Sequence, residues 1–498
     1  MTLTSLVPVF ALMTSLAAAV IIFAIPEERH RLRTLVNLGA AVLKLVLVIY
    51  MVWGVARGIE FRVAFTMVPG VEFVLQADAL AVMFAGLSAV LWLFTTIYAV
   101  GYLKDSPNRS RFFGFFSLCV ASTMGIALAG NLFTFFLFYE MLTLSTYPLV
   151  VHRGTDKALR AGRNYIIYTL SGGVVLLLGI AWLQGLVGDL SFRAAGHFQD
   201  SDPAIHGSLI MIFVLLIAGL GVKAAIFPVH GWLPQAMVAP APVSALLHAV
   251  AVVKAGAFGI VRVVYDIYGI EFSATLGLLE PLAWLAAFTI LYGSARAVFQ
   301  TDLKRRLAFS TVSQVSYIIL GITLFGPIGT VGGLVHLLHQ GIMKITLFFC
   351  AGNYAETLGI HRIDEMDGAG RRMPGTSVAF TIGAFGMIGA PPLAGFVTKW
   401  TMGSGALAAN MSWVIVVLLL SSLLNAAYFL PVLHRLWFRE AAINWPAERR
   451  WGRLETHALL LWPPLLTALM TVLVGLFAAL PFSPLSWAEL IAIREYLP

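Results

Sequence analysis

Charged residues are scarce in this sequence. They make up 11% of its 498 residues, whereas hydrophobic residues make up 59%. Soluble domains carry about a quarter charged residues, so the composition excludes a soluble globular protein. Apolar runs of about 20 residues, long enough to cross a bilayer, recur along the whole chain. The sequence therefore predicts an all-α polytopic membrane protein surrounded by the lipid bilayer.

Cysteine is nearly absent. Cys119 and Cys350 are the only two, and both lie in apolar runs without a CxxC or Cys/His spacing. This argues against a disulfide framework, an iron–sulfur cluster and a structural zinc site. A Gly-rich phosphate loop, a catalytic triad and paired catalytic carboxylates are also lacking. We therefore expect no cofactor and no metal, and no redox or hydrolytic site within this chain.

The first apolar run has neither a basic region before it nor a small-residue cleavage site after it. We therefore expect a spanning helix here and not a removable signal. The chain as a whole predicts about fourteen spans. Their expected limits are 3–25, 34–56, 79–102, 112–129, 131–150, 164–187, 207–229, 242–264, 275–297, 307–325, 329–352, 375–400, 410–434 and 458–480.

Basic residues are unevenly distributed between the connectors. Most of the 32 Lys and Arg fall in alternate connectors, and few, Arg262 among them, fall in the others. Because basic connectors face the cytoplasm, both termini are expected outside. The net charge of +8 is thus a topology signal and does not indicate nucleic-acid binding. The acidic turn at Glu27 and Glu28 is expected to be solvated.

Lys223 stands at the end of an apolar run that is then broken by Pro228, Gly231 and Pro234. Proline removes a helical donor and clashes with the preceding turn, and irregular backbone at membrane depth must be enclosed by protein or line a cavity. A buried lysine beside such a break is a candidate proton or ion site. The alternative is a lysine that reaches the interface from a helix end.

A second break, at Pro391 and Pro392, precedes Lys399. Paired interrupted helices in two halves of a chain indicate an internal repeat and a transport site. We therefore expect two five-helix units, of spans four to eight and nine to thirteen. The expected divisions of the chain are 1–111, 112–264, 265–437 and 438–498.

Glu140 lies in the middle of the fifth expected span. An ionised acid at the bilayer centre costs at least ~2.5 kcal/mol, so Glu140 should be paired or protonated. Its expected partner is Lys223, and the protonation of each would then depend on the other. The alternative is a neutral acid hydrogen-bonded to a nearby Ser or Thr.

His248 and Lys254 share the eighth expected span. Six residues apart, they are separated by about 600° around a continuous helix, so they should face different neighbours and relay charge between them. His248 could instead be a hydrogen-bonded packing residue.

His336, His339 and Gln340 fall on one face of the eleventh expected span, and Lys344 follows one turn later. This pattern suits a proton relay, because no carboxylate or thiolate completes a metal site. The roles of Lys44 and Asp78 stay open between function and structure, with helix capping favoured for Asp78. The hydroxyls around Ser310 could line a half-channel or bond helices together.

Four of these segments resemble the antiporter-like subunits shared by respiratory complex I and the Mrp-type cation/proton antiporters. They are Phe138-Tyr-Glu-Met-Leu, Lys223-Ala-Ala-Ile-Phe-Pro-Val-His-Gly-Trp-Leu-Pro, Pro242-Val-Ser-Ala-Leu-Leu-His-Ala and Pro391-Pro-Leu-Ala-Gly-Phe-Val-Thr-Lys399. The resemblance implies fourteen helices in two inverted five-helix repeats, with helices seven and twelve discontinuous. It also implies a hydrophilic axis through Glu140, Lys223, Lys254, His336, Lys344 and Lys399.

Within that family the chain looks most like the D-type subunits of Mrp antiporters, since it ends soon after the fourteenth span and has lysine at position 399. The resemblance implies a proton-translocating subunit of a Na⁺/H⁺ antiporter, with other hydrophobic subunits as partners, in a bacterial or archaeal cytoplasmic membrane. A proton-pumping subunit of a redox complex, of complex I or membrane-hydrogenase type, and a self-sufficient transporter are the alternatives.

Overall fold

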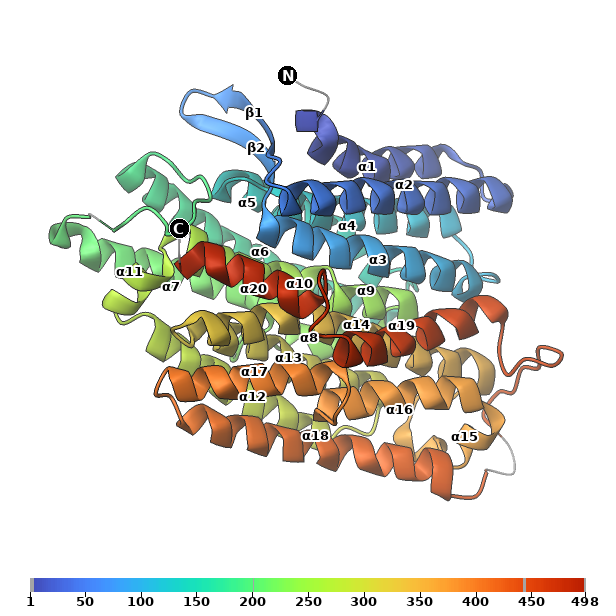
Figure 1. Ribbon diagram of the computed structural model, residues 1–498. Coiled ribbons are helices and arrows are strands. Elements are labelled where there is room, and N and C mark those ends of the chain that lie inside the picture. Colours follow the sequence, from blue (N-terminus) through green and yellow to red (C-terminus); the bar gives the residue numbers. More distant parts are fainter. Residues whose placement is uncertain (1–3, 200, 442–444, 497–498) are drawn as a thin grey trace.

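The computed structural model describes residues 4–199, 201–441 and 445–496. Its long helices lie side by side and alternate in direction, so that α1 begins and α20 ends at the same end of the bundle (Figure 1).

The first expected span begins at residue 3, outside the described residues. The helices are α1 (Val7–Ala24), α2 (His30–Ala56), α3 (Ala79–Tyr102), α4 (Arg109–Leu128), α5 (Leu132–Val150), α6 (Asp156–Val187), α7 (His206–Ala224), α8 (Trp232–Gln235), α9 (Ala241–Ala249), α10 (Val252–Arg262), α11 (Ile270–Thr275), α12 (Leu279–Val298), α13 (Leu303–Thr323), α14 (Pro327–Leu358), α15 (Ala369–Arg372), α16 (Pro374–Ile388), α17 (Ala394–Ala408), α18 (Trp413–Phe438), α19 (Ala458–Leu476) and α20 (Pro484–Tyr496). Short 3₁₀ turns are η1 (Thr4–Leu6), η2 (Pro203–Ile205), η3 (Ala236–Val238) and η5 (Ile363–Glu365), and η4 (Val263–Ile267) is a π-helical segment.

The polytopic helical class is confirmed. In the described part of the chain, 12 helical segments are long and apolar enough to cross a membrane. Two further expected spans have other forms. One is α13, whose first turn contains Lys304, Arg305 and Arg306 and which is rich in hydroxyls. The other is divided into α16 and α17, neither of which is long enough by itself.

A β-hairpin joins α2 to α3, which the sequence analysis did not anticipate. Strand β1 (Phe61–Val68) pairs antiparallel with β2 (Val71–Ala77), and Gly70, at φ 81°, occupies the turn. The hairpin is tied to the start of α5, because Thr134 Oγ1 accepts a hydrogen bond from Val74 N at 2.9 Å. Large apolar residues at every second position, Phe61, Val63 and Phe65, are the period-two signal of a strand; an all-helical expectation overlooked it.

The chain is broken at both places where Pro follows an apolar run. Helix α7 ends at Ala224, and Ala225 takes a left-handed conformation at φ 56°, so the helix ends before Pro228. Helix α16 ends at Ile388, with Gly389 left-handed at φ 95°. The peptide bonds preceding Pro228 and Pro392 are cis. Pro234 lies inside the short helix α8.

A third break divides the segment that was expected to be one continuous span over 242–264. Helix α9 ends at Ala249, and α10 begins at Val252. Neither Gly nor Pro marks this position, so the helical pattern gave no signal of it. The 600° separation inferred for His248 and Lys254 is therefore wrong, since the two residues belong to different helices.

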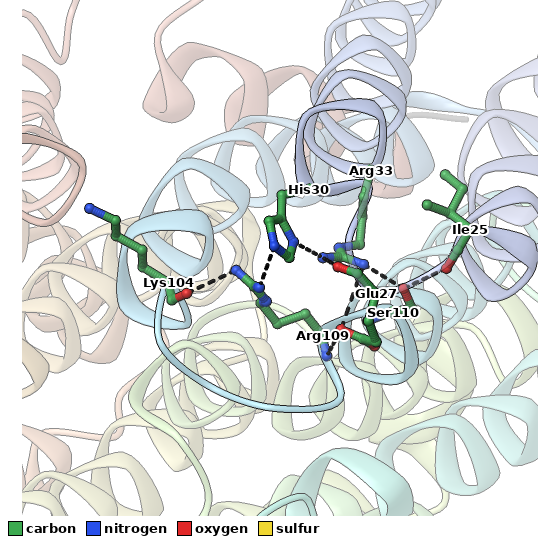
Figure 2. Close-up of polar contacts among 7 residues, drawn as sticks. All are labelled: Ile25, Glu27, His30, Arg33, Lys104, Arg109 and Ser110. Atoms are coloured by element: carbon green, nitrogen blue, oxygen red, sulfur yellow. Dashed lines mark hydrogen bonds and ion pairs between the residues drawn. The ribbon is translucent and has the colours of Figure 1, made fainter.

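Glu27 holds the beginning of α4 in place (Figure 2). Its two carboxylate oxygens accept hydrogen bonds from Ser110 N at 2.7 Å and from Arg109 N at 3.0 Å. The helix has no cap of its own, since Asn108 is left-handed and its side chain makes no capping bond. The acidic turn is therefore more than a solvated connection: it supplies an N-terminal carboxylate from another segment.

The pKa of Glu27 lies below its usual value. Burial opposes ionisation, but the hydrogen bonds from Ser110 and Arg109, together with the guanidinium groups of Arg33 and Arg109, outweigh it. A carboxylate with a lowered pKa stabilises the folded state above its ordinary pKa. That contribution is lost as the pH falls through the lowered value.

Glu27→Ala should lower the melting temperature of the full-length protein in mild detergent, because α4 loses its capping anion. A lost cap costs about 1–2 kcal/mol. Glu28→Ala, which changes the neighbouring acid, is the matched control and should have little effect. The difference should narrow as the pH is lowered below about 4. Equal destabilisation by the two substitutions would contradict the capping role.

Candidate functional site

Lys223 and Glu140 lie together in the structure, as the sequence analysis expected. Lys223 Nζ is 3.9 Å from Glu140 Oε1, donates a hydrogen bond to the main-chain oxygen of Tyr139, and lies 3.3 Å from the centre of the Tyr139 ring. Lys223 is fully buried, which rules out a lysine reaching the interface. Oε1 of Glu140 has no hydrogen-bond partner among the described residues, so no Ser or Thr holds that oxygen.

Lys254, on α10, points to the central helix α14. Its Nζ donates to the main-chain oxygen of Leu337 at 2.8 Å. His248, on α9, is stacked on Phe348 with 4.5 Å between ring centres, and neither of its ring nitrogens has a hydrogen-bond partner in the described structure. The structure thus places Lys254 and His248 against α14 from two separate helices.

Helix α14 carries His336, His339 and Lys344, all of them buried. His339 Nδ1 lies 3.1 Å from Thr398 Oγ1 on α17. Lys344 Nζ donates to Ser310 Oγ on α13 at 2.6 Å. The residues predicted to share one face of α14 therefore contact two different helices: Lys344 contacts α13 and His339 contacts α17.

Lys399 lies on α17, one short turn beyond the second break. Its Nζ donates to the main-chain oxygen of Ile388 at 2.7 Å and to Ser422 Oγ at 2.6 Å. Ile388 is the last residue of α16, where carbonyl groups lack helical partners. The ammonium group therefore caps α16, and its charge is favourable at that end of the helix dipole.

Two residues that the sequence analysis missed connect Lys344 with Lys399. Tyr428 Oη donates to Asn425 Oδ1 at 2.6 Å and lies 2.7 Å from Ser310 Oγ. Because the tyrosine proton is used for Asn425, Ser310 must donate to Tyr428. The available signal was Asn425 and Tyr428, three residues apart in a mostly apolar run.

The series of hydrogen bonds from Lys344 towards Lys399 ends at the main-chain oxygen of Met387, which both Asn425 and Lys399 approach. Asn425 Nδ2 donates to Met387 O at 2.9 Å, and Lys399 Nζ lies 3.3 Å from the same oxygen. From the other side, Lys344 donates into Ser310. Both ammonium groups therefore donate toward the middle of the connection.

The buried and half-buried groups Glu140, Lys223, Lys254, His336, His339, Lys344 and Lys399 are together called the line below. An ionic cluster outside this line was recognised only in part. Asp78 caps α3 through Ala81 N at 2.7 Å, as expected. It also pairs with Arg262 at 2.8 Å, and Arg262 reaches Asp266 at 2.9 Å. Arg262, counted from the sequence among the connector residues, is buried at 1% exposure, because the two carboxylates neutralise it.

Lys44 is buried and lies apart from the line. It donates to Ser15 Oγ, and its Nζ is 4.4 Å from the centre of the Trp92 ring. No group of three His, Cys, Asp or Glu side chains within the described residues is arranged to hold a metal ion.

The chemistry available to the line is proton transfer. Its buried lysines and histidines can each take up or release one proton, whereas Glu140 supplies the carboxylate at one end. Neither ring nitrogen of His336 nor any amide atom of Gln340 has a partner in the described chain. Buried polar groups are costly unless hydrogen-bonded, so we expect ordered water beside α14.

Broken helices and buried ammonium groups define a class: multi-pass membrane proteins that handle ions. A model of the family described as "NADH:quinone oxidoreductase/Mrp antiporter, TM" matches residues 129–425. The chain is 35% identical to the N subunit of the NADH-quinone oxidoreductase of Desulforudis audaxviator over 422 residues, which cover 82% of each chain. It is 29% identical to the D-type subunit of the Na⁺/H⁺ antiporter of Bacillus subtilis, over 81% of this chain and 80% of that one.

A solved structure shows the same architecture. A chain of the Mrp complex from Dietzia sp. matches with a TM-score of 0.86 and 26% sequence identity, over 100% of this chain and 98% of that one. The chain belongs to the family of membrane subunits shared by NADH:quinone oxidoreductases and Mrp antiporters, as the sequence motifs indicated.

Lys254→Met should raise the melting temperature of the full-length protein in detergent. Lys254 forms no ion pair in the described structure and has only a main-chain oxygen as partner. Replacing a buried ion pair by apolar residues of similar volume is often neutral or stabilising by about 1–4 kcal/mol, and removing a buried ammonium group that has no carboxylate partner removes its desolvation cost in the same way. Lys104→Met, at an exposed position, should leave the melting temperature unchanged. A clear fall for Lys254→Met would mean that the ammonium group stabilises the fold.

Proposed function

We propose that this chain is the proton-translocating subunit of a multisubunit antiporter that exchanges Na⁺, or another monovalent cation, for protons. The observation that carries the proposal is the contact of Lys223 and Glu140 beside the first helix break. A change in the charge of either residue alters the energy of the other. The pair can therefore couple a proton on Glu140 to a proton on Lys223.

The path that we propose follows the buried groups in space. It runs from Glu140 and Lys223 through Lys254 to His336, His339 and Lys344 on α14, and then to Lys399; His248 lies beside it. Lys254 contacts α14 directly, and Ser310, Tyr428 and Asn425 lie between the last two lysines. This geometry supports lateral transfer of charge within the membrane.

Partner subunits are part of the proposal because of where the line ends. Its terminal groups, Glu140 and Lys399, are half-buried, whereas the groups between them are fully buried. A neighbouring hydrophobic subunit could contact either end and so pass on the charge. We place the chain in a bacterial or archaeal cytoplasmic membrane with its basic connectors in the cytoplasm and both termini outside.

We further propose that two inverted five-helix units, within residues 112–264 and 265–437, build the line. Two features support this: each unit contains one helix broken at proline, after α7 in the first and after α16 in the second, and a lysine lies beside each of these two breaks. The chain would supply transport only, and any redox chemistry would come from other subunits.

The second candidate is a proton-pumping subunit of a redox complex. The 35% identity to the N subunit of an NADH-quinone oxidoreductase favours it. The same row of buried lysines would carry protons in either kind of complex.

Purification from the native host in mild detergent should separate the two candidates. We expect hydrophobic partner subunits without flavin or iron–sulfur absorbance, identified by mass spectrometry. Co-purifying soluble subunits with such absorbance would instead support the redox pump. A lone chain that still exchanges cations for protons in proteoliposomes would contradict both.

Lys223→Ala should abolish cation/proton exchange in membrane vesicles while the partner subunits still co-purify, because the pair with Glu140 loses its proton carrier. Exchange is followed by a pH-sensitive dye after addition of Na⁺. Lys44→Ala removes an equally buried lysine outside the line and should retain exchange. Normal exchange in Lys223→Ala, in assembled protein, would refute the proposed path.

A further inference from the structure

A second site lies away from the line, at the end of the bundle that carries the basic connectors. It is a cavity of about 620 Å³ between the start of α6, the segment of α8 and η3, the start of α13 and the end of α14. Five basic residues line it: Arg153, Lys157, Arg160, Lys304 and Arg305.

The positive charge in this cavity is not neutralised by the protein. None of the five basic side chains forms an ion pair within the described chain; those that are bonded use neutral groups, as Lys304 does with the main-chain oxygen of Ala239 at 2.6 Å. Arg153 lies 3.5 Å from the hydroxyl of Tyr102. The single acid in the lining, Asp302, accepts a hydrogen bond from Arg305 N at 2.8 Å and so caps α13. Burial lowers the pKa of Lys304 to about 7, but the three arginines and Lys157 still outweigh Asp302. The cavity therefore has an excess of positive charge that suits an anion.

An apolar stripe continues from the cavity along α6. Arg160 and Asn164 line the cavity, and Ile167 and Val174 follow on the same helical face. Ile167 is 51% exposed and Val174 68% exposed. A ligand that fills the basic cavity and covers this stripe must have an anionic head and an apolar tail.

We propose that the cavity binds the headgroup of an anionic phospholipid, whose acyl chains lie along the exposed stripe of α6. Basic pockets between membrane helices on the cytoplasmic side bind such headgroups. Free phosphate shares the head chemistry but would leave the stripe uncovered. The cavity contains no residue of the line, so a test of lipid binding there is independent of the proposed transport function.

Native mass spectrometry of the full-length protein, purified with the subunits it carries and then delipidated, tests the site with defined lipids. Cardiolipin or phosphatidylglycerol should bind, and phosphatidylcholine should bind more weakly. Lys157→Gln/Arg160→Gln should reduce the affinity for the anionic lipids about 25-fold, which is about fivefold for each of the two lost charges. Lys157→Arg/Arg160→Lys should retain binding, which separates charge from fold. Arg29→Gln/Arg31→Gln removes the same charge from exposed residues at another connector and should change affinity by less than about twofold.

Three results would overturn the proposal. The first is equal binding of phosphatidylcholine and the anionic lipids, or equal binding by the double-glutamine variant. The second is complete displacement of the lipid by millimolar inorganic phosphate, which would make the cavity a free-anion site. The third uses a photo-reactive amino acid at Gln235, which lines the cavity: cross-linking to a partner subunit, and not to lipid, would assign the cavity to a protein interface.

Discussion

The structure depends on how an ammonium group is accommodated inside a membrane protein. Lys223, Lys254, Lys344 and Lys399 each donate a hydrogen bond to a main-chain oxygen. A charge at the bilayer centre costs at least ~2.5 kcal/mol, and helical carbonyls are mostly occupied. A break in a helix supplies free carbonyls at membrane depth. Of these four oxygens, however, only that of Ile388 lies at a break; the other three, of Tyr139, Leu337 and Leu307, lie inside the continuous helices α5, α14 and α13. Main-chain oxygens, whether at a break or within a helix, thus hold the lysines inside without a carboxylate beside each of them.

The small number of carboxylates beside the buried lysines affects how the lysines exchange protons. An ion pair at every lysine would fix each proton in place, because the charged form would be strongly favoured. Only Lys223, among these four lysines, has an acid within ion-pair distance in the described chain. The other three are held by neutral oxygens, so their protonation responds to charges elsewhere on the line. Ser310 and Tyr428 add a hydroxyl connection whose direction can reverse, since a hydroxyl both donates and accepts.

The sequence predicted what local chemistry dictates. Pro228 and Pro391 revealed the breaks, and an isolated Lys or Glu in an apolar run marked the line. The break at Val250 has no such mark, and it is a product of packing. Partners from distant segments were likewise hidden: Tyr428 is 118 residues from Ser310 in the chain, and no periodicity connects them.

Charge in the connectors was predicted as a whole but not residue by residue. The distribution of Lys and Arg predicted that both termini lie on the same side of the membrane, and α1 begins and α20 ends at the same end of the bundle (Figure 1). Which end of the bundle faces the cytoplasm stays a prediction. The distribution could not tell that Arg262 is buried between Asp78 and Asp266. Nor could it tell that Glu27 caps a helix that starts at residue 109, because that contact exists only once the helices are packed.

The burial of α14 bears on how the protein is made. This helix carries His336, His339 and Lys344 and is buried along nearly all its length, against α3, α9 and α13 before it and α16, α17, α19 and α20 after it. When α14 emerges from the ribosome, the later four helices do not yet exist. The side of α14 that carries His339 would then lack its partner Thr398 on α17 and would meet lipid, where a polar group is costly. The insertion machinery must therefore retain α14 until the last third of the chain has been synthesised, which makes biogenesis of this subunit a process completed only at its C-terminal helices.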